Sequence, residues 1–188
     1  MTTLTALLRA DLTAMAEGGR LSAARVLMRL AVHARWRAVV GLRIAQGALR
    51  SPATRPLALW LADRVLAASG AVLEPASTIG PGLVLKHTTG LVVGGDVVAG
   101  ARLTLHQNVT LGDRRPFVGQ PRLGDDVVIG AGACVLGPVT IGDRAVIAAN
   151  SVVLDDVPDD STVAGSPARV VGTARRDLFS GRPGPIGR

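Results

Sequence analysis

The chain has 188 residues, which is enough for one domain with a substantial core, or for a domain with a small appendage. It has only two Phe and two Trp, so Val, Leu, Ile and Ala must build its core. A single cysteine, Cys134, excludes an internal disulfide framework, and there is no zinc-type Cys/His cluster. We expect a cytoplasmic protein, because neither a signal-peptide pattern nor an uncharged apolar run of spanning length is present.

The net charge of +7 is concentrated in one part of the chain. Residues 1–71 contain ten Arg and three acidic residues, whereas residues 72–188 contain eleven of each sign. Such an excess can attract nucleic acid, an anionic membrane surface or a phosphorylated substrate. No aromatic residues are interleaved with the basic ones as a base-stacking surface would need, so we expect no nucleic-acid partner.

Residues 1–71 are predicted to form a helical N-terminal segment, because Ala, Leu and Arg dominate residues 4–70. Gly18 and Gly19 separate a short first helix from a longer one that begins near Leu21. Ser51 and Pro52 break the chain again, and Pro56 can open the next helix. Basic and aliphatic residues alternate in this segment, so we expect helices that pack on their neighbours, with His33 in a structural role.

From residue 72 to 172 the pattern changes to a period of six, which is typical of a β-helix built from hexapeptide repeats. Each repeat is a short strand and a turn, and the repeats bury one another's apolar faces. Branched aliphatic residues open thirteen hexapeptides, in two phased blocks: Leu73, Ile79, Leu85, Leu91, Val97, Leu103 and Val109, then Leu123, Ile129, Val135, Ile141, Ile147 and Val153.

The two blocks are separated by fourteen residues instead of twelve, and the polar segment GDRRPFVGQP lies between them. We therefore predict a loop at 112–122 that leaves the coil, and extruded loops commonly carry function. Residues 173–188 are rich in Gly, Pro and Arg and are predicted to be a flexible tail.

The repeats resemble the hexapeptide-repeat acyltransferases, most closely the serine acetyltransferase-like branch. The matching stretches are LKHTTGLVVGGDVVAGARLTLHQNVTLG, VVIGAGACVLGPVTIGDRAVIAANSVVLDDVP and VAGSPARVVG. The resemblance implies a mainly β fold, a left-handed parallel β-helix with three hexapeptides per coil. It also implies acetyl-CoA as donor, no metal, and a homotrimer or dimer of trimers with active sites between adjacent subunits.

His87 matches the catalytic histidine of this family in its H-x-T-G setting. An alcohol is a poor nucleophile at neutral pH, and a neutral imidazole can take its proton as it attacks a thioester. Backbone N–H groups of neighbouring turns can stabilise the oxyanion. If both substrates are bound together, no covalent enzyme intermediate is needed.

The remaining site residues are predicted less directly. His106 follows His87 by nineteen residues, about one coil, and either binds the acceptor or serves as a turn residue. The predicted acceptor-binding residues are Lys86, His106, Arg114, Arg115 and Gln120. For acetyl-CoA, the resemblance implies small residues that let the pantetheine run along the β-helix and a basic residue near the nucleotide: Gly112, Ala131, Ala149 and Arg169.

The chain also departs from the serine enzymes at the acceptor side. These enzymes place Asp directly before the catalytic His and Asp fifteen residues before it, where this chain has Lys86 and Val72. Their loop motif DRHP resembles DRRP at 113–116. Counted back from VVIGAG, however, the motif falls on residues 118–121, which read VGQP. In that register the Arg and the His that hold the serine carboxylate in the serine enzymes are both missing.

These departures make a neutral or anionic acceptor the leading hypothesis: a sugar or glycan hydroxyl, as in acetyltransferases of exopolysaccharide and colanic acid type. The basic N-terminal segment would then contact the inner membrane face. The first alternative is O-acetylation of serine or a related amino acid in cysteine or natural-product biosynthesis. The second is a non-catalytic β-helix scaffold. A metal enzyme of the gamma carbonic anhydrase kind is rejected, because only His87 and His106 lie in the repeats.

Overall fold

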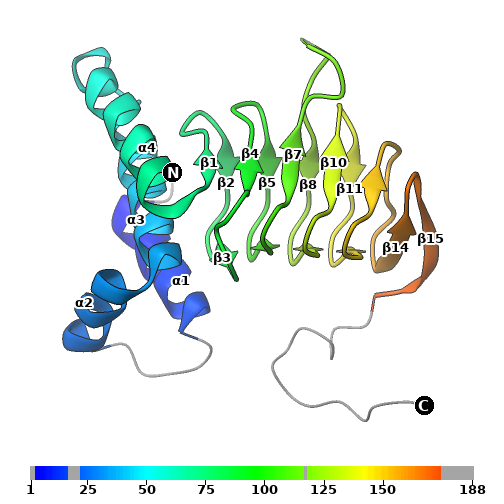
Figure 1. The fold of residues 1–188 in the computed structure, drawn as a ribbon, viewed down its shortest axis with the longest axis horizontal. Coiled ribbons are helices and arrows are strands. Elements are labelled where there is room, and N and C mark those ends of the chain that lie inside the picture. The colour runs from blue at the N-terminus through cyan, green and yellow to red at the C-terminus, as the bar shows by residue number, and fades with distance from the viewer. Residues whose placement is uncertain (1–2, 17–21, 117, 175–188) are drawn as a thin grey trace.

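The protein is described from a computed structural model, which defines residues 3–16, 22–116 and 118–174. Four α-helices form one end of the molecule, and a parallel β-helix extends from them (Figure 1). The helices are α1 (Leu4–Met15), α2 (Ala23–Val32), α3 (Ala34–Ala48) and α4 (Arg55–Ser69), with a 3₁₀ turn, η1, at Pro52–Thr54. No helix among the described residues is both long and apolar enough to cross a membrane.

The predicted long second helix is in fact two helices that meet at His33, whose backbone is extended (φ −109°, ψ 116°). Side-chain contacts across the junction stabilise the break. The Arg37 guanidinium donates to the carbonyls of Leu30 and Ala31 at 3.0 and 2.9 Å, which satisfies the open end of α2. Arg29 lies 4.9 Å from the centroid of the buried Trp36 ring. Gly18 and Gly19, the other predicted break, lie outside the described residues.

The β-helix has three parallel sheets, one along each side, as expected for the left-handed solenoid of hexapeptide repeats. The first sheet has the order β1-β4-β7-β10-β13, the second β11-β8-β5-β2, and the third β15-β14-β12-β9-β6-β3. Among the strands of the described residues, only β15 runs antiparallel to its neighbour. The strands are β1 (Val72–Leu73), β2 (Thr78–Ile79), β3 (Val84–Leu85), β4 (Val92–Val93), β5 (Val98–Ala99), β6 (Thr104–Leu105), β7 (Thr110–Gly112), β8 (Arg122–Leu123), β9 (Val128–Ile129), β10 (Cys134–Leu136), β11 (Thr140–Ile141), β12 (Val146–Ile147), β13 (Val152–Val153), β14 (Ser161–Gly165) and β15 (Ala168–Thr173).

The phase predicted for the first block of repeats changes after Leu85. The next inward strand residue is Val93, eight residues on, followed at intervals of six by Ala99, Leu105 and Leu111. The predicted residues Leu91, Val97, Leu103 and Val109 are also fully buried, but they belong to a second inward row, in the turns before the strands. Because the strand row and the turn row both contain Leu and Val here, the sequence alone does not tell which of the two rows opens the hexapeptides.

The extra two residues therefore lie in the turn at 86–91 and not in the loop. Strand pairing shows this directly. Leu85 pairs with Leu105, so the coil that contains the turn at 86–91 is two residues longer than the coil from Val93 to its partner Leu111, eighteen residues later. The loop between β7 and β8 leaves the solenoid as predicted (Figure 1), and it lengthens its coil from 18 to 24 residues, as the pairing of Ala99 with Leu123 shows.

The helices are attached to the first coil through a buried ion pair. Arg43 Nε donates to Asp11 Oδ2 at 2.8 Å, and the two side chains are 1% and 0% exposed. Arg43 also donates to the carbonyls of Ile79 and Gly80, and Asp11 accepts from the backbone N–H groups of Gly82 and Leu83. This cluster joins α1 and α3 to the turn that leads into β3.

The C-terminal boundary differs slightly from the predicted one. Thr173, expected to begin the tail, is the last residue of β15, and the Ala174 N–H donates to the Asp160 carbonyl at 2.7 Å. The rest of the predicted tail lies outside the described residues.

Candidate active site

One corner of the β-helix carries the predicted catalytic histidine and both predicted pantetheine alanines. In the third sheet, Leu85 pairs with Leu105, Leu105 with Ile129, and Ile129 with Ile147. Two residues after each of these come His87, Gln107, Ala131 and Ala149. Because successive strands lie about 4.8 Å apart, these four positions follow one edge over roughly 14 Å.

His87 lies in the only one of these four turns that is longer by two residues, and its side chain is exposed. The lengthened turn is held at several points: the Lys86 N–H donates to the Leu105 carbonyl, and the Gly90 N–H donates to the Gly70 carbonyl. Gly90 has φ 66°, and a Cβ there would collide with Asn108 Oδ1. The turn therefore presents His87 outward from a fixed base.

A pocket of about 420 Å³ opens beside His87, between the lengthened turn and the junction of α2 and α3. The turn contributes Lys86, His87, Thr88 and Thr89, and the junction contributes Val32, His33, Ala34 and Arg35. His33 was expected to be structural, but its side chain is exposed and lines this pocket. The sequence did not point to Arg35 or His33 as site residues, because the helix break that places them here has no Gly or Pro signal.

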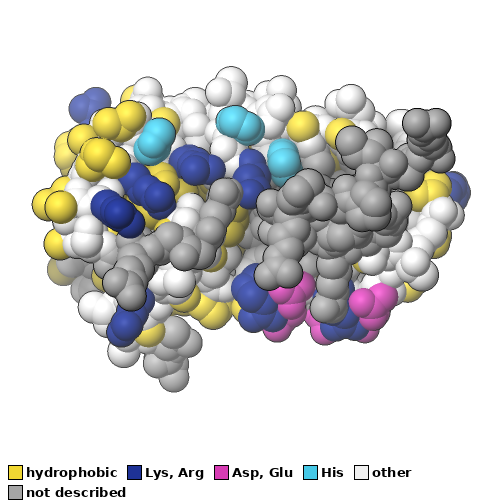
Figure 2. Space-filling model, turned by 90° about the horizontal axis from the view of Figure 1, so that it is seen from below, with side chains coloured by type: hydrophobic (Ala, Val, Ile, Leu, Met, Phe, Trp, Pro, Cys, Tyr) yellow, Lys and Arg dark blue, Asp and Glu magenta, His cyan; other side chains and the backbone are white. Residues whose placement is uncertain are grey.

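His106 lies on the next coil beside Lys86, and it is half-buried. Burial lowers the pKa of His106 below its usual 6.5, and the nearby charges of Lys86 and His87 lower it further. Figure 2 shows the three histidines on one face with basic side chains among them, whereas the acidic side chains visible there gather along the lower edge. The described basic side chains thus lie among the histidines, and the lowered pKa favours the neutral form of His106.

The lowered pKa of His106 predicts a pH-dependent stability. The unfolded chain binds this proton below about pH 6.5, before the folded chain does, so acid favours unfolding in that range. We expect the stabilisation that comes from folding with a neutral His106 to be fully present above pH 6.5. It should be lost as the pH falls through the pKa of His106 in the folded state. Urea unfolding of wild type and His106→Gln between pH 5 and 7.5 tests this: the variant should lose less stability on acidification. An equal loss of stability on acidification in wild type and His106→Gln would contradict the prediction.

The residues predicted for acetyl-CoA occupy different places. Ala131 and Ala149 line the same edge as His87, and the Asn150 N–H donates to the Ala131 carbonyl across the two coils. Arg169 lies on β15 beyond them and forms an exposed ion pair with Asp155 at 3.2 Å. Gly112 ends β7 in a different sheet, where a Cβ would meet no atom within 4 Å. Within one chain, only the two alanines share the edge of His87.

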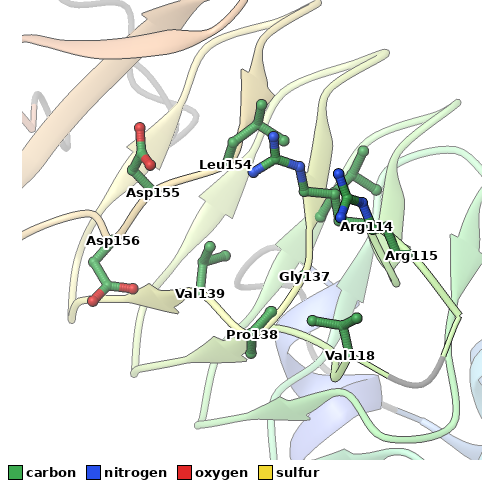
Figure 3. A pocket seen from close by; sticks show the side chains of 10 residues that line it. Arg114, Arg115, Val118, Gly137, Pro138, Val139, Leu154, Asp155 and Asp156 are labelled. Carbon is green, nitrogen blue, oxygen red and sulfur yellow. The ribbon is translucent and has the colours of Figure 1, made fainter.

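The predicted acceptor residues of the loop lie away from His87 in the same chain. Arg114 and Arg115 line a pocket of about 570 Å³ with Gly137, Pro138 and Asp155, at the corner that follows the first sheet (Figure 3). In Figure 3 their side chains extend over this pocket, on the opposite side from Asp155 and Asp156.

Gln120 has structural contacts at the base of the loop. Its Oε1 accepts from the Asp96 N–H at 3.0 Å, and its Nε2 donates to Asp113 Oδ2 at 3.1 Å. These contacts fix where the loop returns to the solenoid. A role of Gln120 with an acceptor stays a prediction.

Among the acidic residues that the structure describes, none lines the His87 pocket to replace the Asp that the serine enzymes have at the position of Val72. Val72 is half-buried in β1, and its N–H donates to the Leu91 carbonyl. Glu74 is exposed and is not among the residues that line the His87 pocket. Within the described part of the chain, no group of three or more His, Cys, Asp or Glu side chains is placed to hold a metal ion.

The architecture defines a parallel β-helix protein built from hexapeptide repeats, and comparisons with known proteins agree. Residues 120–155 match the family model described as bacterial transferase hexapeptide (six repeats). Serine acetyltransferase 4 of Arabidopsis thaliana is 43% identical over 118 residues, which are 62% of this chain and 33% of that protein. The chain spans less than half the length of the curated relatives that it matches.

Solved structures match over a larger share of their length. Serine acetyltransferase of Brucella abortus strain S19, in complex with coenzyme A, is 33% identical with a TM-score of 0.80, and the match covers 91% of this chain and 68% of that one. Soybean serine acetyltransferase complexed with serine is 38% identical with a TM-score of 0.78, and the match covers 89% and 69%. The chain belongs to the hexapeptide-repeat acyltransferases, in their serine acetyltransferase-like branch.

Proposed function

We propose that this protein is an acetyl-CoA-dependent O-acetyltransferase that acts on the hydroxyl of a small acceptor. The observation that carries the proposal is the shared edge of His87, Ala131 and Ala149 on coils of one sheet. Small side chains along this edge leave room for an extended ligand, and such a ligand would end at the exposed histidine. That the matched Brucella enzyme binds coenzyme A supports the same reading.

The chemistry assigned to His87 is general-base catalysis in a ternary complex. The imidazole takes the proton of the acceptor hydroxyl as its oxygen attacks the thioester carbonyl carbon. The carbon–sulfur bond then breaks, and the departing CoA thiolate takes the proton back from the imidazolium. The products are an O-acetyl ester and free CoA thiol, and the histidine is neutral again.

Serine is the first acceptor to test. The relatives and structures described above are serine acetyltransferases, and one holds serine, so they favour the serine alternative over a sugar or glycan. They give no support to the resemblance with exopolysaccharide enzymes. The acceptor side of this chain still departs from the serine pattern at Lys86 and Val72.

The proposal also includes a homotrimer or a dimer of trimers. Arg114 and Arg115 lie at a different corner from His87, so they could reach an acceptor at His87 only from a neighbouring subunit. This agrees with the intersubunit sites that the family resemblance implies. A single chain would offer only the turn and helix residues of the His87 pocket.

Thiol release from acetyl-CoA tests the proposed function. With L-serine as acceptor, we expect free CoA to form in step with an acetylated product identified by mass spectrometry. A panel of homoserine, nucleotide sugars and oligosaccharides serves as the comparison. Turnover of sugars without turnover of serine would reverse the order of acceptors. An absence of acceptor-dependent thiol release across the panel would contradict the proposal.

A further inference from the structure

We propose that Gln107 binds the donor substrate: its side-chain oxygen accepts a hydrogen bond from the pantetheine amide nearest to the sulfur and so fixes the thioester beside His87. This inference rests on the proposed function, because it concerns the acetyl-CoA of the same reaction. It adds a side-chain contact to an edge on which the predicted pantetheine residues, Ala131 and Ala149, can offer only their backbone groups.

Gln107 lies on this edge between His87 and Ala131. Each of the three residues comes two positions after the last residue of its strand, and the strands β3, β6 and β9 are neighbours in the third sheet. The next position along the edge is Ala149. Of the three edge positions beyond His87, Gln107 is therefore the one with a polar side chain.

The side-chain oxygen of Gln107 lacks a donor. In the part of the chain that the structure describes, Oε1 is buried and has no hydrogen-bond partner, although the residue as a whole is half-buried. Its backbone is fixed, because the Gln107 carbonyl accepts from the Gly132 N–H and the Asn108 N–H donates to the Thr89 carbonyl, both at 2.9 Å. A buried acceptor without a donor is unfavourable, so this position suits a ligand that brings an N–H group.

The place of Gln107 favours the donor substrate over the acceptor as that ligand. Gln107 is not among the described residues that line the 420 Å³ pocket beside His87, where an acceptor would enter. It lies instead on the edge along which the pantetheine is proposed to run.

The dimensions of pantetheine agree with this assignment. Two carbons separate its sulfur from the first amide nitrogen, so ordinary bond lengths place the two atoms roughly 4 Å apart. Successive coils of the edge lie about 4.8 Å apart. With the sulfur at His87, the first amide N–H therefore lies at the level of Gln107.

A hydrogen bond at this amide would act on the reacting carbon through only a few bonds. It would limit sliding of the pantetheine along the edge and hold the thioester carbonyl at a fixed height relative to the imidazole. Such positioning matters because small displacements of reacting groups are costly in rate.

The hydrogen bond is tested with CoA and an analogue in which an oxygen atom replaces this one N–H, so that the amide becomes an ester. Calorimetry with the full chain should show that wild type binds CoA about fivefold or more tightly than the ester analogue, the usual value of one hydrogen bond. Equal affinity of wild type for the two ligands would overturn the inference.

Gln107→Met supplies the second arm, because Met has a similar length and no hydrogen-bonding amide. The variant should bind CoA and the ester analogue with equal affinity, and its melting temperature should match that of wild type. A purely structural role of Gln107 would weaken both ligands alike and keep their ratio. An unchanged ratio in Gln107→Met would therefore overturn the inference.

Turnover separates the two proposals. If the ratio of affinities collapses in Gln107→Met while no acceptor is acetylated, the proposed function fails and the contact of Gln107 stands. If wild type acetylates an acceptor equally well from acetyl-CoA and from its ester analogue, and binds both equally, the contact fails and the proposed function stands.

Discussion

Replacement of His87 by alanine is expected to lower kcat/KM for acetyl transfer by about 10²–10⁴-fold, the usual contribution of a positioned general base. Among the described residues, His87 is the one titratable side chain that both lines the 420 Å³ pocket and lies on the edge shared with Ala131 and Ala149. Steady-state thiol release with the best acceptor, compared between wild type and His87→Ala, measures the effect.

The variant should keep the fold, because the His87 side chain is exposed and the lengthened turn is held by backbone hydrogen bonds. An unchanged melting temperature and subunit composition would show that lost activity is lost chemistry. If His87→Ala transferred acetyl groups as fast as wild type, the general-base assignment would fail. The scaffold alternative would then gain weight.

Replacement of Asp11 by alanine is expected to destabilise the protein by about 3–5 kcal/mol, as removal of one partner of a buried ion pair does. The change leaves the buried Arg43 guanidinium without its carboxylate, and it removes the acceptor for the Gly82 and Leu83 N–H groups. Chemical denaturation of the assembled protein at fixed concentration measures the loss.

The matched control is Asp155→Ala, which breaks an exposed ion pair with Arg169. The Asp155 side chain is 72% exposed and the Arg169 side chain is 65% exposed. This pair should contribute no more than about 1 kcal/mol. A comparable small loss in Asp11→Ala would show that the cluster contributes little to docking the helices on the first coil. Because the cluster adjoins the turn before β3, a large loss there should also loosen the base of the His87 site.

The solenoid itself could be predicted from the sequence, because each repeat must place an aliphatic residue inward and the period follows from that need. The register of the repeats from Leu91 to Val109 could not be predicted. Leu and Val fill the row of inward turn residues there, whereas in the later coils that row often holds Ala or Ser. The two extra residues around His87 were therefore assigned to the loop. A lengthened turn is visible only when strand pairing fixes which residues share a coil.

His87, Ala131 and Ala149 were predicted from the family motifs, and the structure places them on one edge; their roles stay predictions. Arg35 and His33 were missed because their place depends on the break between α2 and α3. That break is stabilised by Arg37 and by the packing of Arg29 on Trp36, which are contacts between residues and not local chain signals. In the proposed trimer, the position of Arg114 and Arg115 relative to an acceptor would depend on how the subunits assemble, and no local pattern of the sequence shows that.

A crystal structure of the protein with bound coenzyme A tests most directly whether acetyl-CoA runs along the edge that ends at His87. We predict that the pantetheine arm lies beside Ala149 and Ala131, with its sulfur nearest to His87. Pantetheine bound elsewhere, for example in the pocket of Arg114 and Asp155, with its sulfur remote from His87 of every subunit, would contradict the account.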